Sequence, residues 1–523
     1  MRTLASACLV AIAIVMAIVL GNRARQWNDE LALASPPLAA VPPQLDDPHT
    51  PRLTGRVVLV IVDGLGADEA RLPFLDELRE HGAGTTARVP YPTISRPNYV
   101  TILTGVPPRD SGVRANRVYV SVAVDTVMDR VQHAGLHVAT ASDYGVLPSL
   151  FVRHATSLAG IAWLEHDTHV TPPPPVTWPV DDARRVGSLG ELAGTIAELA
   201  ATDAAFIAVL VLDVDRAGHA SGVGDTYRHA ALAVDRMLRA GFTGIDLARD
   251  TVIVTADHGH VTPGGHGGDE PEVSNVPLVL AGKGIVPGAV AREARLIDVA
   301  PTIAALLGVP APGHAEGRAL VELLALAPDE AARRTVTDAT RGRALATVVD
   351  AARARESTPD PIRLALALGG LGLAVALAFV LRRHSILAIT PGSLAGALAL
   401  VVMILVIVVI TRGRVSPSYV PSLARTQELG SIGAGIAVVL QVVASWRVLR
   451  HATDRMATTN GIAFVGLAIA FGAIGLVRAW FSPPYFDVPP PFWMVMVPTL
   501  DLAAATCALA TVVVLIVGAI RRT

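Results

Sequence analysis

The sequence is poor in charged residues, in aromatic residues and in cysteine. Of its 523 residues, 17% are charged and 4% are aromatic, whereas 52% are hydrophobic. A soluble domain has about 25% charged residues, so a chain this apolar is not expected to be a single soluble globule. Disorder is excluded too, because it requires low hydrophobicity and high net charge. The two cysteines, Cys8 and Cys507, both lie in apolar runs, which excludes a disulfide framework and a cysteine-rich zinc module.

A basic surface is also missing. The formal net charge is −2, and Lys283 is the single lysine of the chain. Proteins that bind nucleic-acid polymers carry clustered basic residues. We therefore expect no nucleic-acid polymer among the partners.

The hydrophobic residues are concentrated at the two ends of the chain. Residues 1–21 contain an apolar run that can be a cleaved signal peptide or a retained signal anchor, and its length favours the anchor. Five further runs are long enough to span a bilayer, at about 363–381, 391–411, 429–446, 461–479 and 494–518. Arginines flank them unevenly, which predicts a multi-pass plasma-membrane protein whose central region lies outside the cytoplasm. Asp501 lies within the last run, and an acid inside a membrane span is a functional hypothesis by default.

The central region differs in composition from both ends. Residues 22–51 form a Pro-rich linker, residues 52–325 alternate short apolar runs with helical patterns, and residues 326–361 form a helical linker to the membrane domain 362–523. The alternation predicts an α/β domain with a mostly parallel sheet and flanking helices, next to an all-α transmembrane region. The expected strands are 57–62, 206–212, 251–256 and 277–281, and the expected helices include 72–81, 188–201 and 226–240.

Acidic residues follow three of the expected strands directly. Asp63 follows the first strand, Asp213 and Asp215 follow the second, and Asp257 follows the third. Ligands bind beyond the carboxyl ends of strands in open α/β sheets, so these side chains can converge on one crevice. Asp215 is preferred to Asp213, because a tight turn can present it together with His219.

Two ligand sets for divalent ions can be drawn from these residues and from His266, which lies in the glycine-rich loop 264–268. The sets are Asp215, His219 and His266, and Asp63, Asp257 and His258. Carboxylate and imidazole without thiolate suit zinc or manganese. Two such ions about 4 Å apart can hold the attacking and leaving oxygens of a phosphoryl transfer. Four other histidines lack this placement and are interpreted as surface or core residues, namely His154, His166, His169 and His260.

Ser95 is the candidate nucleophile. It lies in the segment 92–98 (PTISRPN), ahead of a short helical pattern whose first turn suits Pro97. An anion is favoured at a helix N-terminus, and a metal bound to the serine oxygen would lower its pKa further. Arg96, Asn98 and the nearby backbone amides could hold the non-bridging oxygens of a substrate phosphate.

Each of these features is weak alone. An Asp-Gly pair after a strand is usually a turn, and a serine before a helix is most often its cap. A single histidine between glycines is most often a loop residue. Their occurrence together, each at an expected strand end or helix start, favours an active site.

Taken together, the motifs resemble the alkaline phosphatase superfamily, specifically its type I phosphodiesterase/nucleotide pyrophosphatase branch. They are also similar to those of the glycosylphosphatidylinositol ethanolamine phosphate transferases. The matching motifs are VDGL (62–65), PTISRPN (92–98), LTG (103–105), DRAGH (215–219), TADHG (255–259), GGHGG (264–268), VPLVLAGKGI (276–285), DVAPT (298–302), LLGVP (306–310) and GR (317–318). The resemblance covers about residues 55–325 and implies an alkaline-phosphatase-like fold with a metal-activated Ser95 that forms a covalent phospho-enzyme.

The branches of the superfamily differ at a few positions. The Ser-Arg-Pro stretch and the His-Gly-Gly loop resemble the ethanolamine phosphate transferases, whereas Asn98 resembles the phosphodiesterases, in which this position holds a substrate oxygen. Tyr99 stands where the maturation motif of sulfatases requires arginine, which disfavours that class. Phosphomonoesterase activity stays a further alternative.

We therefore expect a membrane-bound enzyme that uses two divalent ions, zinc or manganese, to cleave or transfer a phosphodiester-type group. The substrate would be a phosphate-diester small molecule or a lipid or glycan head group, with membrane lipid as a further partner. Attack by water would make the protein a phosphodiesterase, which we favour. Attack by a glycan or lipid hydroxyl would make it a phosphoethanolamine-type transferase. A non-catalytic membrane assembly or transport component is the remaining alternative.

Overall fold

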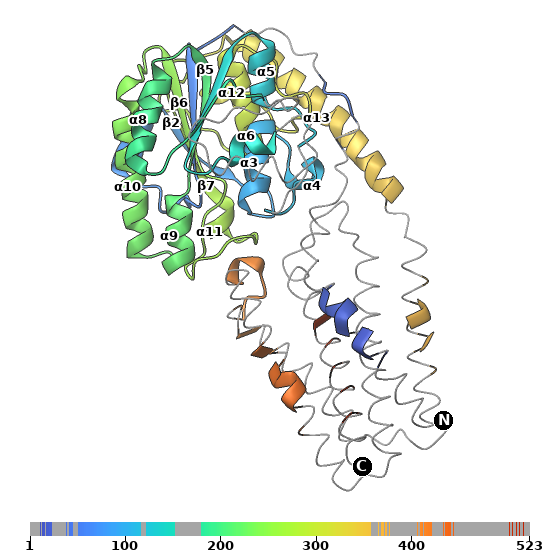
Figure 1. Ribbon diagram of the computed structural model, residues 1–523. Helices are drawn as coiled ribbons and strands as arrows, with labels where there is room; N and C mark the ends of the chain where they lie inside the picture. The colour runs from blue at the N-terminus through green and yellow to red at the C-terminus, as the bar shows by residue number, and fades with distance from the viewer. Residues whose placement is uncertain are drawn as a thin grey trace. The chain divides into compact units, whose positions relative to one another are not determined.

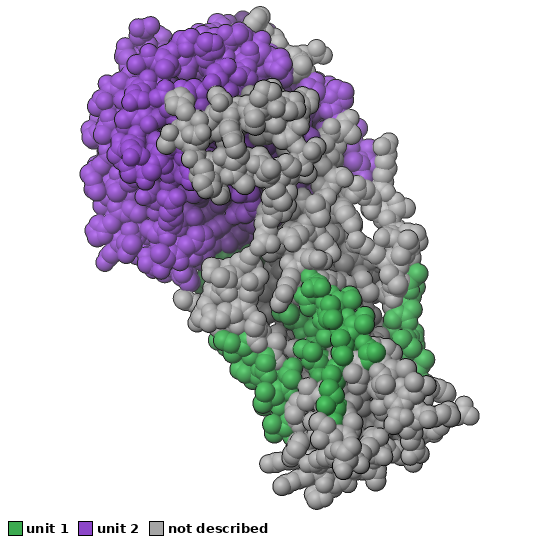
Figure 2. Space-filling model, viewed as in Figure 1, with its two compact units in different colours: residues 1–30, 356–523 green, residues 31–355 purple. Residues whose placement is uncertain are grey.

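The computed structural model describes residues 51–116, 122–151 and 179–356 without a break, together with short stretches nearer the two ends of the chain. Contacts divide the chain into two compact units, residues 31–355 and residues 1–30 with 356–523 (Figure 2). The first of these, here called the α/β unit, contains all the candidate site residues.

An eight-stranded sheet forms the centre of the α/β unit (Figure 1). Its strands are β1 (Arg56–Val62), β2 (Ala83–Arg88), β3 (His137–Ser142), β4 (Asp182–Arg185), β5 (Ala204–Val211), β6 (Asp250–Thr255), β7 (Asn275–Gly282) and β8 (Ala294–Arg295). Their order across the sheet is β4-β3-β5-β1-β6-β7-β2-β8. Among the described strands, β7 alone runs against the others, since it pairs antiparallel with both β6 and β2.

The central strands are continuous apolar runs. Every residue of β5 and of β6 is buried, and in β1 Arg56 alone is partly exposed. Strands buried on both faces are typical of parallel sheets covered by helices. The four strands predicted from the sequence are confirmed as β1, β5, β6 and β7, with bounds that differ by at most two residues. The mostly parallel α/β sheet is confirmed with them.

Helices cover both faces of the sheet (Figure 1). They are α2 (Pro73–His81), α3 (Ser95–Thr104), α4 (Pro108–Ser111), α5 (Val127–His133), α6 (Val146–Leu150), α8 (Leu189–Ala200), α9 (Asp213–Ser221), α10 (Asp225–Gly241), α11 (Pro271–Ser274), α12 (Val299–Leu307) and α13 (Pro328–Glu356). The packed helices α2, α8 and α10 form one layer, and α3, α5 and α12 form another. The predicted helices 72–81, 188–201 and 226–240 correspond to α2, α8 and α10.

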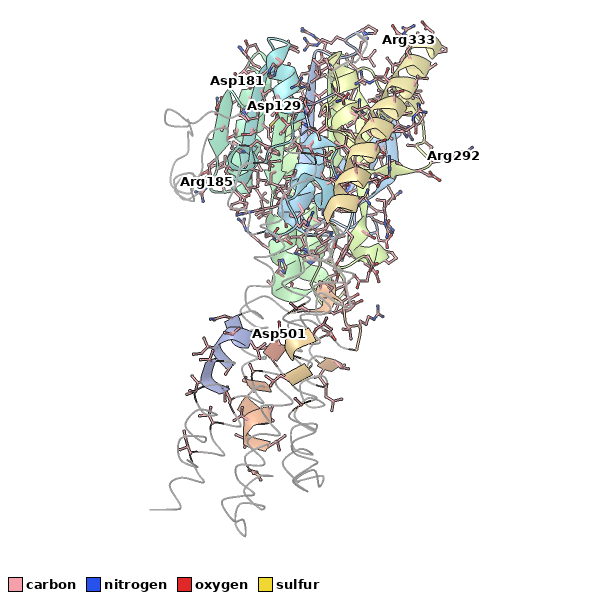
Figure 3. All side chains as sticks on the ribbon, turned by 90° about the vertical axis from the view of Figure 1, so that its right-hand side faces the viewer. Asp129, Asp181, Arg185, Arg292, Arg333 and Asp501 are labelled. Carbon is pink, nitrogen blue, oxygen red and sulfur yellow. The ribbon has the colours of Figure 1, made fainter. Side chains whose placement is uncertain are left out.

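The long helix α13 has one side exposed to solvent and one side buried against the α/β unit. Arg333 projects from it into solvent (Figure 3) and pairs with Asp329 at 2.8 Å. On its inner side, Arg334 is fully buried, and Arg341 donates to the backbone oxygens of Ala315 and Gly317. The helix α13, which lies within the predicted helical linker 326–361, is therefore a surface helix that packs on the α/β unit.

The predicted membrane segments lie wholly or partly outside the described residues. No helix in the described part of the chain is both long enough and apolar enough to cross a bilayer. Asp501, which is described, is 1% exposed. The predictions of a signal anchor and of five spans stay predictions.

Candidate active site

Three adjacent strands bring the candidate residues to one edge of the sheet. The strand β1 lies between β5 and β6 and is parallel to both. Asp63 follows β1, the helix α9 follows β5, and Asp257 follows β6 closely. Parallel strands end at the same edge, which is why acidic residues far apart in the sequence meet here.

The first group of side chains surrounds His258. Its Nε2 atom lies 3.4 Å from Asp63 Oδ1, 3.2 Å from Asp257 Oδ2 and 3.1 Å from Ser95 Oγ. A tetrahedral zinc ion with ligands at about 2.0–2.2 Å holds them about 3.3–3.6 Å apart. These separations are therefore close to those that a single ion requires.

The two carboxylates of this group each use one oxygen for a hydrogen bond. Tyr99 donates from its hydroxyl to Asp63 Oδ2, and the backbone N–H of Gly64 donates to Asp257 Oδ1 at 3.1 Å. The other oxygens, Asp63 Oδ1 and Asp257 Oδ2, are buried and have no hydrogen-bond partner among the described residues. Buried polar atoms in native proteins are normally satisfied. A cation between these oxygens and His258 would satisfy both.

The second group is built on α9 and the glycine-rich loop. Asp215 and His219 lie one helical turn apart, with His219 Nε2 3.4 Å from Asp215 Oδ1. His266 Nε2 lies 3.2 Å from His219 Nε2 and 3.9 Å from the same Asp215 oxygen. The predicted tight turn is wrong: the segment is helical, and the i,i+4 spacing of a helix places Asp215 and His219 on one face. Asp213 pairs with Arg216 instead and does not join this group.

Backbone oxygens fix how two of the imidazoles point. His266 Nδ1 lies 2.8 Å from the oxygen of Thr93, and His258 Nδ1 lies 3.1 Å from the oxygen of Gly259. With Nδ1–H as the donor, Nε2 keeps its lone pair and turns toward the acidic residues. Thr93 also bonds the loop through its hydroxyl, which donates to Gly268 and accepts from Gly267. In metal-binding proteins, a hydrogen bond from the nitrogen that does not bind the metal orients the histidine ring in this way.

The acids of the first group favour protonation in the absence of a cation. Burial, followed by the charges of Asp257 and Asp215, raises the pKa of Asp63 well above its usual value. Burial and the charge of Asp215 raise the pKa of Asp257 to about 8. Asp215 differs: although burial opposes ionisation, the hydrogen bond with His260 and the charges of His266 and His258 lower its pKa. A bound cation would reverse the upward shifts.

The histidines favour the neutral form that a metal ligand needs. Burial lowers the pKa of His258 well below its usual value, with a further contribution from His266. Burial lowers the pKa of His266 to about 4, and burial also lowers that of His219. The chemistry and the spacing of both groups therefore fit divalent ions.

Ser95 is the first residue of α3, next to the first group. The side chain of Arg96 donates to the hydroxyl of Tyr144 and lies 5.9 Å from the centre of its ring. The backbone N–H of Arg96 donates to Asn116 Oδ1 at 3.0 Å. Asn116 is exposed beside the nucleophile and was not predicted from the sequence, in which no strand end or motif marks it.

Asn98 does not reach solvent. It is 0% exposed, and its Nδ2 donates to the backbone oxygens of Pro92 and Ile94 at 3.0 and 3.1 Å. The side chain thus holds the loop before α3 in place. Because its donor group is occupied, we do not assign Asn98 to the substrate as the sequence had suggested.

His260 was interpreted from the sequence as a surface or core histidine, yet it lies within the site. The residue is 3% exposed, and its Nε2 lies 3.0 Å from Asp215 Oδ1. The donor atoms of Asp215, His258 and His260 form a third group within 4.8 Å of one another. The spacing of two residues after His258 was the available signal, since alternate residues of an extended segment point to the same side. His154, His166 and His169 lie outside the described residues.

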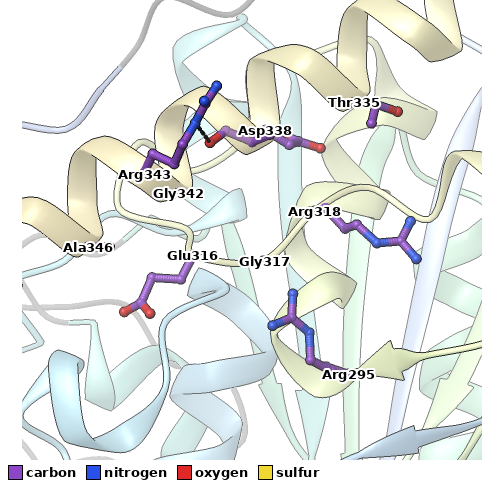
Figure 4. Close-up of a pocket in the computed structure, with 10 residues that line it drawn as sticks. Arg295, Glu316, Gly317, Arg318, Thr335, Asp338, Gly342, Arg343 and Ala346 are labelled. Carbon is purple, nitrogen blue, oxygen red and sulfur yellow. Dashed lines mark hydrogen bonds between the residues drawn. The ribbon is translucent and has the colours of Figure 1, made fainter.

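A pocket of about 340 Å³ lies elsewhere, against α13 (Figure 4). Its lining includes Arg295, Arg318 and Arg343 but none of the candidate site residues. Arg295 pairs with Asp298 at 3.3 Å, and Arg318 pairs with Glu322 at 2.7 Å. Arg343 donates to the backbone oxygen of Ala339 and the hydroxyl of Thr340. Since all three arginines already have partners, we assign no ligand to this pocket.

Comparison with known proteins gives matches over the same region. Residues 57–264 match the family model described as type I phosphodiesterase / nucleotide pyrophosphatase. A 2,3-bisphosphoglycerate-independent phosphoglycerate mutase of Synechococcus elongatus is 31% identical over 152 residues, which cover 26% of this chain and 28% of the relative. The human GPI ethanolamine phosphate transferase 2, catalytic subunit, is 25% identical over 295 residues, which cover 52% of this chain and 28% of the relative. The chain thus spans less than a third of the length of these curated relatives.

Solved structures of similar proteins include murine ectonucleotide pyrophosphatase/phosphodiesterase 5. It is 16% identical with a TM-score of 0.38, over 49% of this chain and 96% of that one. The alkaline phosphatase PafA is 13% identical with a TM-score of 0.40, over 53% of this chain and 100% of that one. The match of residues 57–264 to the type I phosphodiesterase / nucleotide pyrophosphatase family model confirms the resemblance predicted from the motifs.

Proposed function

We propose that the protein is a two-metal enzyme that cleaves or transfers a phosphodiester-type group through Ser95. One observation carries the proposal. Asp63 Oδ1 and Asp257 Oδ2 are buried without a hydrogen-bond partner among the described residues, and both lie within 3.4 Å of His258 Nε2, next to the Ser95 hydroxyl. A non-catalytic domain would have no reason to keep two unsatisfied carboxylate oxygens beside a serine at a helix start.

The proposed ligand sets use every member of the two groups. Asp63, Asp257, His258 and the Ser95 oxygen would hold one ion, and Asp215, His219 and His266 would hold the other with an open position. Three ionised aspartates and a serine alkoxide carry a charge of −4, which two divalent ions balance. Bound there, such ions would lower the pKa of the Ser95 hydroxyl and offset the charge of the phosphate oxygens.

The reaction has two displacements at phosphorus. In the first, the Ser95 hydroxyl loses its proton to solvent, Oγ forms a bond to phosphorus while the bond to the leaving oxygen breaks, and the leaving oxygen gains a proton from solvent. In the second, water or an acceptor hydroxyl loses a proton to solvent as its oxygen bonds to phosphorus, and Ser95 Oγ leaves and regains its proton. The N-terminus of the ten-residue helix α3 favours negative charge at Ser95 in both steps.

Asn116 is the residue that we propose for contact with the substrate phosphate. Its Oδ1 accepts from the backbone N–H of Arg96, so this contact does not use the Nδ2 group, and the residue is exposed. An amide donor beside the nucleophile can hold a non-bridging oxygen as charge develops in the transition state. It would take the role that the sequence had suggested for Asn98.

The acceptor decides between two activities. Hydrolysis is favoured by the family match of residues 57–264, whose description names phosphodiesterase. Transfer of ethanolamine phosphate to a glycan or lipid hydroxyl is the second candidate, because the human relative that covers 52% of this chain is named as such a transferase. The apolar runs after residue 362 support a membrane-bound protein with the α/β unit outside the cytoplasm, near lipid or lipid-linked substrates.

The test is mass spectrometry of Ser95 in the full-length protein after incubation with zinc or manganese and candidate donors. A diester donor should leave a covalent adduct on Ser95 that retains one ester group. A bare phosphoryl adduct would indicate monoester chemistry, and an adduct that carries ethanolamine, glycerol or a nucleotide would identify the donor. Release of the adduct to water or to an added alcohol would separate hydrolysis from transfer.

Two results would contradict the proposal. One is a full-length protein that binds no divalent metal under equilibrium dialysis. The other is an adduct that forms equally well in Ser95→Ala. The matched control is Ser188→Ala, which removes a serine that caps α8 away from the site and should leave adduct formation unchanged.

A further inference from the structure

His260 lies closer to the Asp215 carboxylate than either proposed histidine ligand does. Its Nε2 is 3.0 Å from Asp215 Oδ1, compared with 3.4 Å for His219 and 3.9 Å for His266. The His260 side chain is completely buried, and its ring meets those of His219 and His266 edge-on at 5.1 and 5.3 Å. The residue is therefore fixed against the second metal group without belonging to it.

The backbone of the site leaves room for this ring. A Cβ atom at Gly218 of α9 would lie 2.7–2.8 Å from three atoms of the His260 imidazole. A Cβ atom at Gly64 would lie 2.9 Å from His260 Nε2. Gly64 follows the proposed ligand Asp63, and Gly218 lies in α9 between the proposed ligands Asp215 and His219. Both glycines thus leave space that the His260 ring fills, and a side chain at either position would require the ring to shift.

The hydrogen-bond partners indicate which nitrogen carries the proton. His260 Nδ1 is buried and has no partner among the described residues, whereas Nε2 faces a carboxylate oxygen. A proton on Nε2 makes one hydrogen bond, and a proton on Nδ1 would be buried unsatisfied, which is costly. Nε2–H is therefore the donor, and its lone pair is not available to a metal.

We propose that His260 is a positioning residue for Asp215, and this inference rests on the proposed metal-dependent function. The hydrogen bond holds Asp215 Oδ1 beside His219 and His266 while a second lone pair of the same oxygen is free for a cation. Without it, the carboxylate could rotate about its Cα–Cβ bond away from the two imidazoles. The residue would act on metal affinity through Asp215 and would not touch the substrate.

The experiment measures the zinc affinity of the full-length wild type and its variants by competition with a chromogenic chelator. The wild type should show two resolved zinc sites. We expect His260→Ala to weaken one of the two sites by about 10–100-fold, the usual cost of losing a contact that orients a ligand. His260→Gln, whose amide can donate to the same oxygen, should recover most of that affinity. Equal loss in both variants, or no loss in His260→Ala, would overturn the inference.

A second variant tests the same contact without removing the histidine. Gly218→Ala adds one methyl group against the ring and should weaken the same site, while its helix position favours alanine over glycine by about 1 kcal/mol. In the His260→Ala background the added methyl meets no ring, so its effect should disappear. Gly194→Ala in α8, where a Cβ has nothing within 4 Å, is the matched control.

The two proposals fail in different ways. If the wild-type protein binds no zinc or manganese, both the proposed function and this inference are wrong. If the wild type binds two ions and His260→Ala binds both as tightly, only the role of His260 is wrong. If Gly218→Ala weakens binding equally with and without His260, its effect does not pass through the ring, and the inference also fails.

Discussion

The hydroxyl of Tyr99 donates a hydrogen bond to Asp63 Oδ2 at the buried base of the candidate active site. Both side chains are almost completely buried. Burial, with the charge of Asp63, raises the pKa of Tyr99 well above its usual value, so the phenol stays a donor. The bond fixes the carboxylate with Oδ1 toward His258.

We predict that Tyr99→Phe weakens divalent-metal binding by about 10-fold, because Asp63 loses the contact that orients it. The free energy of unfolding should fall by about 1 kcal/mol, the usual net value of one hydrogen bond. Chelator competition and thermal unfolding of the metal-free protein measure the two effects separately.

The matched control for this variant is Tyr227→Phe. Tyr227 is also fully buried, and its hydroxyl bonds only to backbone, donating to Gly64 O at 2.5 Å and accepting from Gly66 N at 3.2 Å. Tyr227→Phe should lower the free energy of unfolding by a similar amount and should weaken metal binding much less. Equal losses of affinity in the two variants would show that Tyr99 has no specific effect on Asp63.

A second prediction concerns the stability of the metal-free protein between about pH 7 and pH 8. The pKa of Asp257 is raised to about 8 by burial and by Asp215, so the folded state holds a proton that the unfolded state has lost. Stability from this group therefore falls as pH rises toward 8, by up to about 1.4 kcal/mol per pH unit. The histidines, whose pKa values are lowered, contribute in the opposite direction, and this contribution grows as the pH falls toward about 6.5, where the unfolded chain gains their protons.

Thermal unfolding in the presence of a chelator, at pH 7, 7.5 and 8, measures this slope. In Asp257→Asn, which cannot ionise, the slope should become shallower. Saturating zinc should reverse the trend in the wild type, because metal binding requires the ionised carboxylate and releases the proton. An unchanged slope in Asp257→Asn would assign the titration to other groups.

Much of this site could be predicted because its signals are local. In β1, β5 and β6, a continuous apolar run ends and an acidic residue follows within a few positions. Such runs fix a buried strand, and parallel strands fix the edge at which they end. The groups around His258 and Asp215 follow from those facts, although the metal itself stays a proposal.

Other features depend on tertiary contacts that no short segment records. The edge strands β2 (AGTTAR) and β4 (DARR) are polar, and they are strands because a neighbour pairs with them. The reversed direction of β7 has no local signal. Asn98 and Asn116 are chemically identical, and only the fold decides that one amide is enclosed and the other is exposed.

A third prediction concerns the start of α2, which has no side-chain cap of its own. Asp235 of α10 supplies one from a distance, since its carboxylate accepts from the backbone N–H groups of Phe74 and Leu75 at 2.9–3.1 Å. Asp235 is 3% exposed. Asp235→Ala should lower the free energy of unfolding by about 1–3 kcal/mol, because two buried donors lose their acceptor.

Thermal unfolding measures this loss of stability. Asp235→Asn keeps one acceptor oxygen, so its free energy of unfolding should fall by less. Zinc affinity should be unchanged in both variants, since α2 carries none of the proposed ligands. A stability of Asp235→Ala equal to that of the wild type would mean that water replaces the carboxylate at no cost.

The two asparagines near the nucleophile give the last prediction. The buried Asn98 side chain donates from Nδ2 to two backbone oxygens, so Asn98→Ala should lower the melting temperature. Asn116 is exposed beside Ser95, so Asn116→Ala should leave the melting temperature unchanged and lower kcat/KM for a diester substrate at least about 10-fold. Steady-state kinetics with a chromogenic diester, at saturating zinc, measures the second effect. If Asn98→Ala instead lost activity at an unchanged melting temperature while Asn116→Ala kept full activity, the assignment of the substrate contact to Asn116 would be wrong.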